Sequence, residues 1–199
     1  MKKTNIKKLA IVATMAALSA LLMFMEFGIP IFPGFLKFDA SGLFAVLTGF
    51  IFSPIYGVAV VIIKNLIHLL FTKTFGVGEL ADILILSSFV LSSGYIYRLR
   101  RTMTAAVISL VVGIAVMTVA GAVVNMFILI PFYSTVMNIP VSAIINMCKA
   151  INPNVNSLFD CVLFLIAPFN LVKGTGLAIL SFLIYKRLAV VLRKFIYNH

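Results

Sequence analysis

The chain has 199 residues, of which 63% are hydrophobic and 11% are charged, and its mean hydropathy is +1.19. A soluble domain usually carries about a quarter charged residues, so this composition predicts an integral membrane protein and excludes a soluble catalytic domain. The net charge of +11 would suggest nucleic acid as the partner of a soluble protein. Here the basic residues cluster at the edges of apolar runs, without a basic groove, and no nucleic-acid partner is expected.

The apolar runs predict an all-α fold, an integral membrane bundle of six transmembrane helices. Each crossing needs about 20 mostly apolar residues. The predicted spans cover residues 9–27, 41–52, 56–71, 79–97, 103–130 and 167–185. The second and third are short for about 30 Å of hydrocarbon, so one is expected to tilt or to start in the preceding loop. The absence of repeats and linkers predicts a single domain over residues 1–199.

The N-terminal segment, basic and then apolar, is similar to a signal peptide. Its apolar run continues through Phe24 and its potential cleavage site is weak, so we interpret it as the first membrane helix. With six spans, the basic clusters within residues 2–8, 98–101 and 186–194 all fall on one side. Because positive residues stay inside, both termini are predicted to be cytoplasmic in a bacterial cell membrane.

The last third of the chain is less regular. Residues 137–157 are predicted to form a long outer loop, with a short helix around residues 143–149. Leu158 to Tyr185 is too long for one perpendicular span, and Pro168 is expected to break or kink it. Cys148 and Cys161 lack zinc-type spacing. We expect them to be unpaired, with a disulfide as the alternative.

Polar residues within a membrane are candidates for function. Asn125 lies about 33 Å along the fifth span, near the outer surface, and Asn170 and Lys173 share one face of the sixth span. Glu79 begins the fourth span, and Asp39 lies in the outer loop after the first. Four separate elements thus bring polar groups toward one outer region. Glu79 and Asp39 could equally be helix-end residues that meet water.

Lys64 and His68 lie four residues apart within the third span and share a face. One interpretation is a proton or ion relay. The interpretation we favour is a lysine that snorkels or is paired internally. Asp82 and Asp160 are the possible acidic partners.

Aromatic residues gather at the predicted outer end. Phe32, Phe35 and Phe38 lie in a loop with Pro30 and Pro33. They could form an interfacial belt or an apolar slot for a planar ring. The prolines favour a structured lid.

Several segments together carry a family resemblance. "FPGFLKFDASG", "KNLIHLLFTKTFGVGELAD", "NMFILIPFYSTVM" and "APFNLVKG" occur in order between residues 8 and 188. They resemble the riboflavin-specific substrate-binding subunits of energy-coupling-factor vitamin transporters. The resemblance implies six helices, inside termini and a riboflavin pocket open to the outside, with flavin mononucleotide as a second candidate ligand. It implies no cofactor and no catalytic or metal site, and it implies a transmembrane coupling protein and two cytoplasmic ATPases as partners.

The resemblance also implies site residues. The substrate-binding candidates are Asn125, Asn170, Lys173, Glu79, Asp39, Phe38, Leu36, Ala40, Phe44 and Gly78. Ala13 and Ala17, a small-xxx-small pair, match an alanine motif that contacts the coupling protein. Where the family often reads "SDIPAL", this chain reads "SGLFAV". Gly42 therefore replaces a carboxylate, which bears on the contacts with the ribityl chain.

Three other functions remain open on the sequence. The same fold could bind thiamine, biotin or pantothenate, although a cationic vitamin should require more acidic residues. An intramembrane enzyme should show paired acids or an "HExxH" motif, and neither appears. A self-sufficient secondary transporter usually shows internal repeats.

Overall fold

The computed structural model describes the backbone of residues 2–197 and the side chains of residues 6–185. Some of the basic residues that contribute to the predicted orientation lie within residues 2–5 and 186–194. Their side chains are outside the described ones. In chain order the elements are α1 (Lys2–Met23), β1 (Phe27–Gly28), β2 (Lys37–Phe38), α2 (Gly42–Ile51), α3 (Pro54–Leu69), α4 (Val77–Arg100), α5 (Met103–Val124), the π-helical turn η1 (Asn125–Leu129), α6 (Ile130–Thr135), α7 (Val141–Lys149), α8 (Leu158–Cys161), the π-helical turn η2 (Val162–Ile166) and α9 (Ala167–Tyr197).

The predicted helical bundle is present, and all six predicted spans are helical. Four stretches of the described chain are long and apolar enough to cross a membrane: Ile6–Met23, Val77–Arg100, Met103–Thr135 and Leu158–Tyr185. The helices α2 and α3 are also apolar but have 10 and 16 residues. Six complete crossings therefore stay a prediction.

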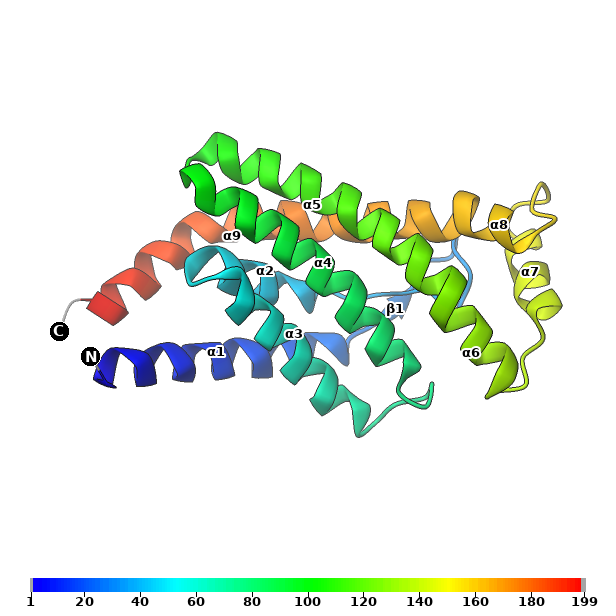
Figure 1. The fold of residues 1–199 in the computed structure, drawn as a ribbon, viewed down its shortest axis with the longest axis horizontal. Coiled ribbons are helices and arrows are strands. Elements are labelled where there is room, and N and C mark those ends of the chain that lie inside the picture. The colour runs from blue at the N-terminus through cyan, green and yellow to red at the C-terminus, as the bar shows by residue number, and fades with distance from the viewer. Residues whose placement is uncertain (1, 198–199) are drawn as a thin grey trace.

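The helices run along the long axis of the molecule (Figure 1). Helix α1 begins and helix α9 ends at one end of the bundle, together with the connection between α4 and α5. The segments 24–41, 70–76 and 136–157 lie toward the other end, which we call the loop end. This arrangement agrees with helices that alternate in direction. The cytoplasmic placement of the termini remains a prediction from the positive charges.

An aromatic cluster closes the bundle at the end that holds the termini. The ring of Phe50 stacks on that of Tyr97 with centroids 4.5 Å apart, and Tyr185 meets both edge-on. The hydroxyls of Tyr97 and Tyr185 are 2.7 Å apart and share a hydrogen bond. Buried tyrosine hydroxyls usually need such a partner, so the cluster ties α2, α4 and α9 together away from the loop end.

Two prolines lie inside long helices without ending them. Pro131 follows η1 and Pro168 follows η2, each by two residues. A proline in a helix removes one hydrogen bond and clashes with the carbonyl four residues earlier. In both helices that carbonyl belongs to the π turn, where the wider spacing makes room. Of the two expectations for Pro168, the break is wrong, because the helix continues from Leu158 through Tyr185, and the kink stays a prediction.

Candidate functional site

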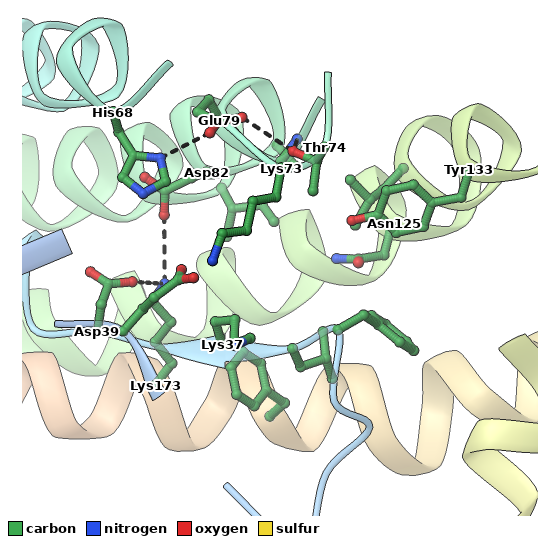
Figure 2. A pocket seen from close by; sticks show the side chains of 18 of the residues that line it. Lys37, Asp39, His68, Lys73, Thr74, Glu79, Asp82, Asn125, Tyr133 and Lys173 are labelled. Carbon is green, nitrogen blue, oxygen red and sulfur yellow. Dashed lines mark hydrogen bonds and ion pairs between the residues drawn. The ribbon is translucent and has the colours of Figure 1, made fainter. Parts of the chain in front are cut away.

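A cavity of about 590 Å³ lies near the loop end, between the segment 24–41, the C-terminal part of α3, α4, α5 with η1 and α6, α7 and α9. Its volume lies within the range of small-molecule sites, which are mostly apolar with a few placed polar groups. Polar residues that line it are Glu26, Lys37, Asp39, His68, Lys73, Thr74, Glu79, Asp82, Asn125, Tyr133, Asn170 and Lys173. Figure 2 shows Asn125 and Tyr133 at one side and the charged residues Asp39, Asp82 and Lys173 at the other.

The segment 24–41 forms one wall of the cavity. Its strands β1 and β2 pair antiparallel, with Phe27 opposite Phe38. Phe32 is buried and meets the ring of Phe169 on α9 edge-on at 5.3 Å. Leu36 is also buried and lines the cavity. The segment is thus a packed structure anchored on α9, as the lid interpretation expects, and its role in covering a ligand remains a proposal.

The charged side of the cavity consists of alternating lysines and aspartates. The Nζ atom of Lys173 lies 2.8 Å from Oδ2 of Asp39 and 3.5 Å from Oδ1 of Asp82. Asp82 in turn pairs with Lys64, with 2.7 Å between Oδ2 and Nζ. Lys64 also donates to Oγ of Ser41 at 2.6 Å. The expectation of an internally paired Lys64 is confirmed, and its acidic partner is Asp82.

Asp39 contacts both the start of α2 and a residue across the cavity, one with each carboxylate oxygen. Its Oδ1 accepts hydrogen bonds from the backbone N–H and the hydroxyl of Ser41, the residue that precedes α2. Its Oδ2 accepts from Lys173 across the cavity. Burial alone would raise the pKa of Asp39, but Lys173 and Lys64, with the hydrogen bonds from Lys173 and Ser41, hold that pKa well below its usual range. Asp39 therefore stays ionised at neutral pH.

Two asparagines supply the uncharged polar groups of the cavity. Asn125 donates to the carbonyl of Gly121 at 2.7 Å, and Asn170 donates to the carbonyl of Ile166 at 2.9 Å. Each amide thus uses its N–H on its own helix, which leaves the amide oxygen for a ligand. The oxygen of Asn125 is buried and has no hydrogen-bond partner within the described residues. A buried acceptor without a partner is rare, so this oxygen marks a position where a ligand donor would be favourable.

A second pair of ionisable groups lies beside the charged side. His68 Nδ1 lies 2.8 Å from Oε1 of Glu79, and Oε2 of Glu79 accepts from Thr72 and Thr74. The imidazole also lies 5.2 Å from the ring of Phe24, centroid to centroid. Glu79 is therefore not merely a helix-end residue in water. It is a buried carboxylate, 5% exposed, that fixes the start of α4 to the end of α3.

The structure brings most of the predicted substrate-binding residues together. Those that line the cavity are Leu36, Asp39, Gly78, Glu79, Asn125, Asn170 and Lys173. Three others do not line it. Phe38 packs on Phe27 and against Gly176, and Phe44 packs against the core from α2. Ala40 lies between Asp39 and Ser41 and also does not line it. For these three, the structure gives no support for a direct contact.

Gly42, which departs from the family pattern, lies against the core. A Cβ at this position would be 2.8 Å from Leu177 Cδ1 and 2.8 Å from Leu86 Cδ1. The position faces apolar side chains of α4 and α9, and it does not line the cavity. A carboxylate here would lose its hydration without an ionic partner. The carboxylates nearest Lys173 in this site are those of Asp39 and Asp82.

Sequence reasoning missed several residues that line the cavity. Asp82 was considered only as a partner of Lys64, yet it also faces Lys173. Tyr133 and Met117 lie on the same long helix as Asn125 and line the cavity with it. A signal for Asp82 exists, because it follows Glu79 by three residues and so shares its helix face. No comparable signal marks Met117 within a uniformly apolar run.

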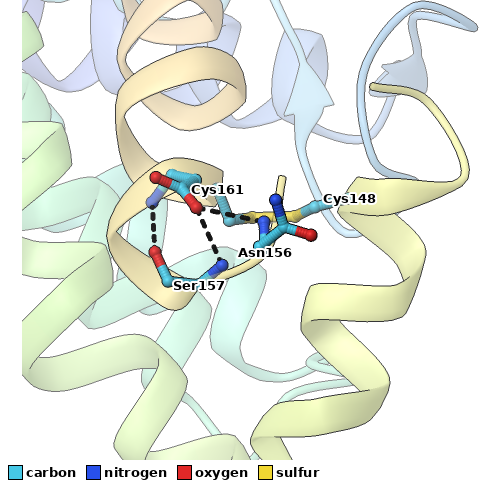
Figure 3. Close-up of a disulfide and its surroundings, with 5 residues drawn as sticks. Cys148, Asn156, Ser157 and Cys161 are labelled. Atoms are coloured by element: carbon cyan, nitrogen blue, oxygen red, sulfur yellow. Dashed lines mark hydrogen bonds between the residues drawn. A yellow bond between two sulfur atoms is a disulfide. The ribbon is translucent and has the colours of Figure 1, made fainter. Parts of the chain in front are cut away.

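The two cysteines form a disulfide between α7 and α8, so the expectation of unpaired cysteines is wrong (Figure 3). The connection from α7 turns back sharply, and the two Cα atoms lie 5.8 Å apart. Ser157 and Asp160 cap α8 reciprocally, which fixes the turn. Asp160 is thus occupied at the helix start and is not the partner of Lys64. Helix α7 contributes Ile144 and Met147 to the cavity, so the disulfide secures one of its walls.

The alanines of α1 divide between two faces. Ala16 and Ala20 are buried in the bundle, whereas Ala13 and Ala17 are exposed on its surface. The exposed pair is therefore free to meet another helix, as the predicted docking role requires, and that role remains a proposal.

Comparisons with known proteins agree with this fold and cavity. Residues 7–185 match the family described as "ECF transporter, substrate-specific component". The riboflavin transporter RibU of Staphylococcus aureus (strain TCH60) is 32% identical over 94% of this chain and 93% of its own. The riboflavin transporter FmnP of Bacillus subtilis (strain 168) is 26% identical over 92% and 93%. A solved S component of a bacterial ECF transporter superposes with a TM-score of 0.74 at 30% identity, covering 94% of this chain and 98% of that one.

This helical membrane protein has a cavity at its loop end that apolar and polar side chains line together. This chain belongs to the substrate-specific (S) component family of energy-coupling-factor transporters. The family is one of transporter components and not of enzymes.

Proposed function

We propose that this protein is the riboflavin-binding S subunit of an energy-coupling-factor uptake transporter. It captures riboflavin from outside the cell and delivers it inward together with a transmembrane coupling protein and two ATPases. The similarity to riboflavin transporters over more than nine-tenths of the chain supports the ligand. In this proposal the chain crosses a bacterial membrane six times, with both termini cytoplasmic and the cavity facing outward.

The observation that carries the proposal is the cavity with its two kinds of polar group. Riboflavin combines a flat, largely apolar ring system with polar edges and a hydroxylated chain. Apolar residues of the segment 24–41 and of α5 and α9 would bury the ring. The amide oxygens of Asn125 and Asn170 would accept hydrogen bonds from it, and Lys173 would donate.

A titration of purified protein with riboflavin tests the proposal. Quenching of riboflavin fluorescence with one ligand per chain is expected, because aromatic side chains that line the cavity, such as Tyr133, would lie against the bound ring and quench its excited state. Thiamine, biotin and pantothenate serve as competitors and should not displace it. Protein that is colourless as purified and leaves riboflavin fluorescence unchanged would refute the assignment. Uptake into vesicles that contain this chain alone, without ATPases, would instead indicate a self-sufficient transporter.

A further inference from the structure

Lys64 is a fully buried cation that the proposed ligand cannot reach. Its exposed fraction is 0%, and it lies on α3 behind the cavity without lining it. Its ammonium contacts Oδ2 of Asp82, Oγ of Ser41 and, at 3.7 Å, the sulfur of Met23. An unpaired charge at this depth would be very unfavourable. A buried cation at this position therefore indicates a role other than packing.

The contacts of Lys64 close a ring. Ion pairs join Lys64 to Asp82, Asp82 to Lys173 and Lys173 to Asp39. Hydrogen bonds of the Ser41 hydroxyl with Asp39 and Lys64 close the ring. Two lysines and two aspartates balance each other, so the ring carries no net charge. Ser41 further accepts a hydrogen bond at its carbonyl from Ser19 on α1. The ring thus joins the segment before α2 with α3, α4 and α9.

Lys64 determines which carboxylate oxygen of Asp82 faces the cavity. Oδ2 of Asp82 is occupied by Lys64 and by Asn65, whose amide donates at 2.9 Å. Only Oδ1 faces Lys173, at a distance of 3.5 Å, which is longer than the 2.8 Å between Lys173 and Asp39. The ammonium of Lys173 is therefore held firmly by one carboxylate and loosely by the other. Because an ammonium has three N–H donors, Lys173 keeps donor capacity for a ligand beside its firm pair with Asp39.

We propose that Lys64 is a positioning residue for the ligand: by engaging Asp82 from behind, it keeps the ammonium of Lys173 available to a polar group in the cavity. The inference rests on the proposed function for its ligand but concerns a residue outside the site. Without Lys64, Oδ2 of Asp82 keeps only the hydrogen bond from Asn65, the carboxylate moves closer to Lys173, and the two aspartates share a single cation. The ligand must then compete with a tighter ion pair, and its affinity falls.

Riboflavin titrations of Lys64→Met in three backgrounds test this coupling. In the otherwise unchanged chain, Lys64→Met should weaken binding about tenfold, which corresponds to about 1.4 kcal/mol. With Asp82 already replaced (Asp82→Asn), or with Lys173 already replaced (Lys173→Ala), the further loss should be less than twofold, because the route from Lys64 to the ligand is broken. The Lys64→Met/Asp82→Asn variant restores a neutral ring and serves as the variant most certain to fold. A tenfold loss in every background, or no loss in the unchanged chain, would overturn the proposal.

A measurement without riboflavin separates this inference from the assignment of the ligand. An amine-reactive reagent is applied to the ligand-free protein, and labelling of Lys173 is followed by mass spectrometry, with exposed Lys149 as the internal reference. Lys64→Met should slow labelling of Lys173 several-fold, and Asp82→Asn should accelerate it. If the unchanged chain fails to bind riboflavin, the proposed function fails while this test stands. Equal labelling rates in all three proteins would reject the positioning role.

Discussion

The side-chain amide of Asn170 on α9 fills the space that a side chain at Gly121 on α5 would take. A Cβ atom on Gly121 would lie 2.4 Å from Cγ of Asn170, a distance that no real contact permits. The carbonyl of the same glycine accepts the hydrogen bond of Asn125. Gly121 therefore positions both asparagines of the cavity. Its carbonyl holds Asn125, and its lack of a side chain makes room for Asn170.

Gly121→Ala should weaken riboflavin binding by about tenfold or more, because the added methyl group displaces the amide of Asn170 from the cavity. Gly174→Ala is the matched control. It also lies in a long helix, but its Cβ would meet Met117 and Ile114 at 3.4–3.5 Å, an ordinary contact distance. The control should bind normally and melt at the same or a slightly higher temperature. Equal affinities of the two variants would show that the position of Asn170 is unimportant.

Lys173→Ala should weaken riboflavin binding by roughly 10- to 100-fold, the usual effect of losing a hydrogen bond from a charged donor. The protein should still fold, since Asp39 keeps its two hydrogen bonds from Ser41 and lies near Lys64. Fluorescence titration gives the affinity, and a melting curve checks the fold. Lys149→Ala, on α7 and outside the cavity lining, is the control. Unchanged affinity in Lys173→Ala would remove this residue from the site.

Ala13→Leu combined with Ala17→Leu should leave riboflavin binding intact while abolishing uptake by the assembled transporter. Both alanines are exposed on α1, so the larger side chains disturb only a helix that packs against them from outside. Radiolabelled riboflavin uptake in cells gives the readout. Ala115→Leu, on the exposed face of α5, tests whether any added bulk in the membrane has the same effect. Normal uptake in the double variant would reject the docking role.

Replacing Cys148 and Cys161 by serine should lower the melting temperature, because the disulfide closes a loop across a sequence separation of 13 residues. Loops of this length correspond to a stabilisation of about 3 kcal/mol. Riboflavin affinity should fall as well, since α7 carries Ile144 and Met147 of the cavity wall. Reductant should destabilise the unchanged protein and leave the serine variant unaffected. Identical melting curves for the two proteins would contradict a stabilising disulfide.

The helices were predictable because membrane spans are long and apolar, and that signal is local. Residues 79–97 and 103–130 were placed within a few residues of α4 and of the long helix that contains α5. The disulfide was not predictable, because it depends on α7 folding back beside α8. The sequence also did not distinguish a break from a kink at Pro168, and the helix continues through that residue. A proline usually signals an end, and nothing in the local sequence shows that η2 makes room for it.

The candidate site was predictable in its polar residues and not in their pairing. Buried polar groups in an apolar chain are conspicuous, so Asn125, Asn170 and Lys173 could be singled out. The ion pairs of Lys64 and Lys173 join α3, α4, α9 and a loop, and such contacts between distant segments carry no local pattern. Phe38 and Phe44 were assigned to the site from the resemblance, and in the structure they pack against other residues and do not line the cavity.

The π turn η1 places one additional residue within a helix that otherwise repeats every 3.6 residues. Everything after it is rotated by about 100° relative to an uninterrupted helix. This rotation brings Tyr133 closer to the phase of Asn125: eight residues of a regular helix would set the two about 80° apart, and the additional residue reduces that to about 20°. Deleting a single apolar residue between Asn125 and Leu129 would therefore remove the wide turn and leave Tyr133, then seven residues after Asn125, on the same face of a regular helix.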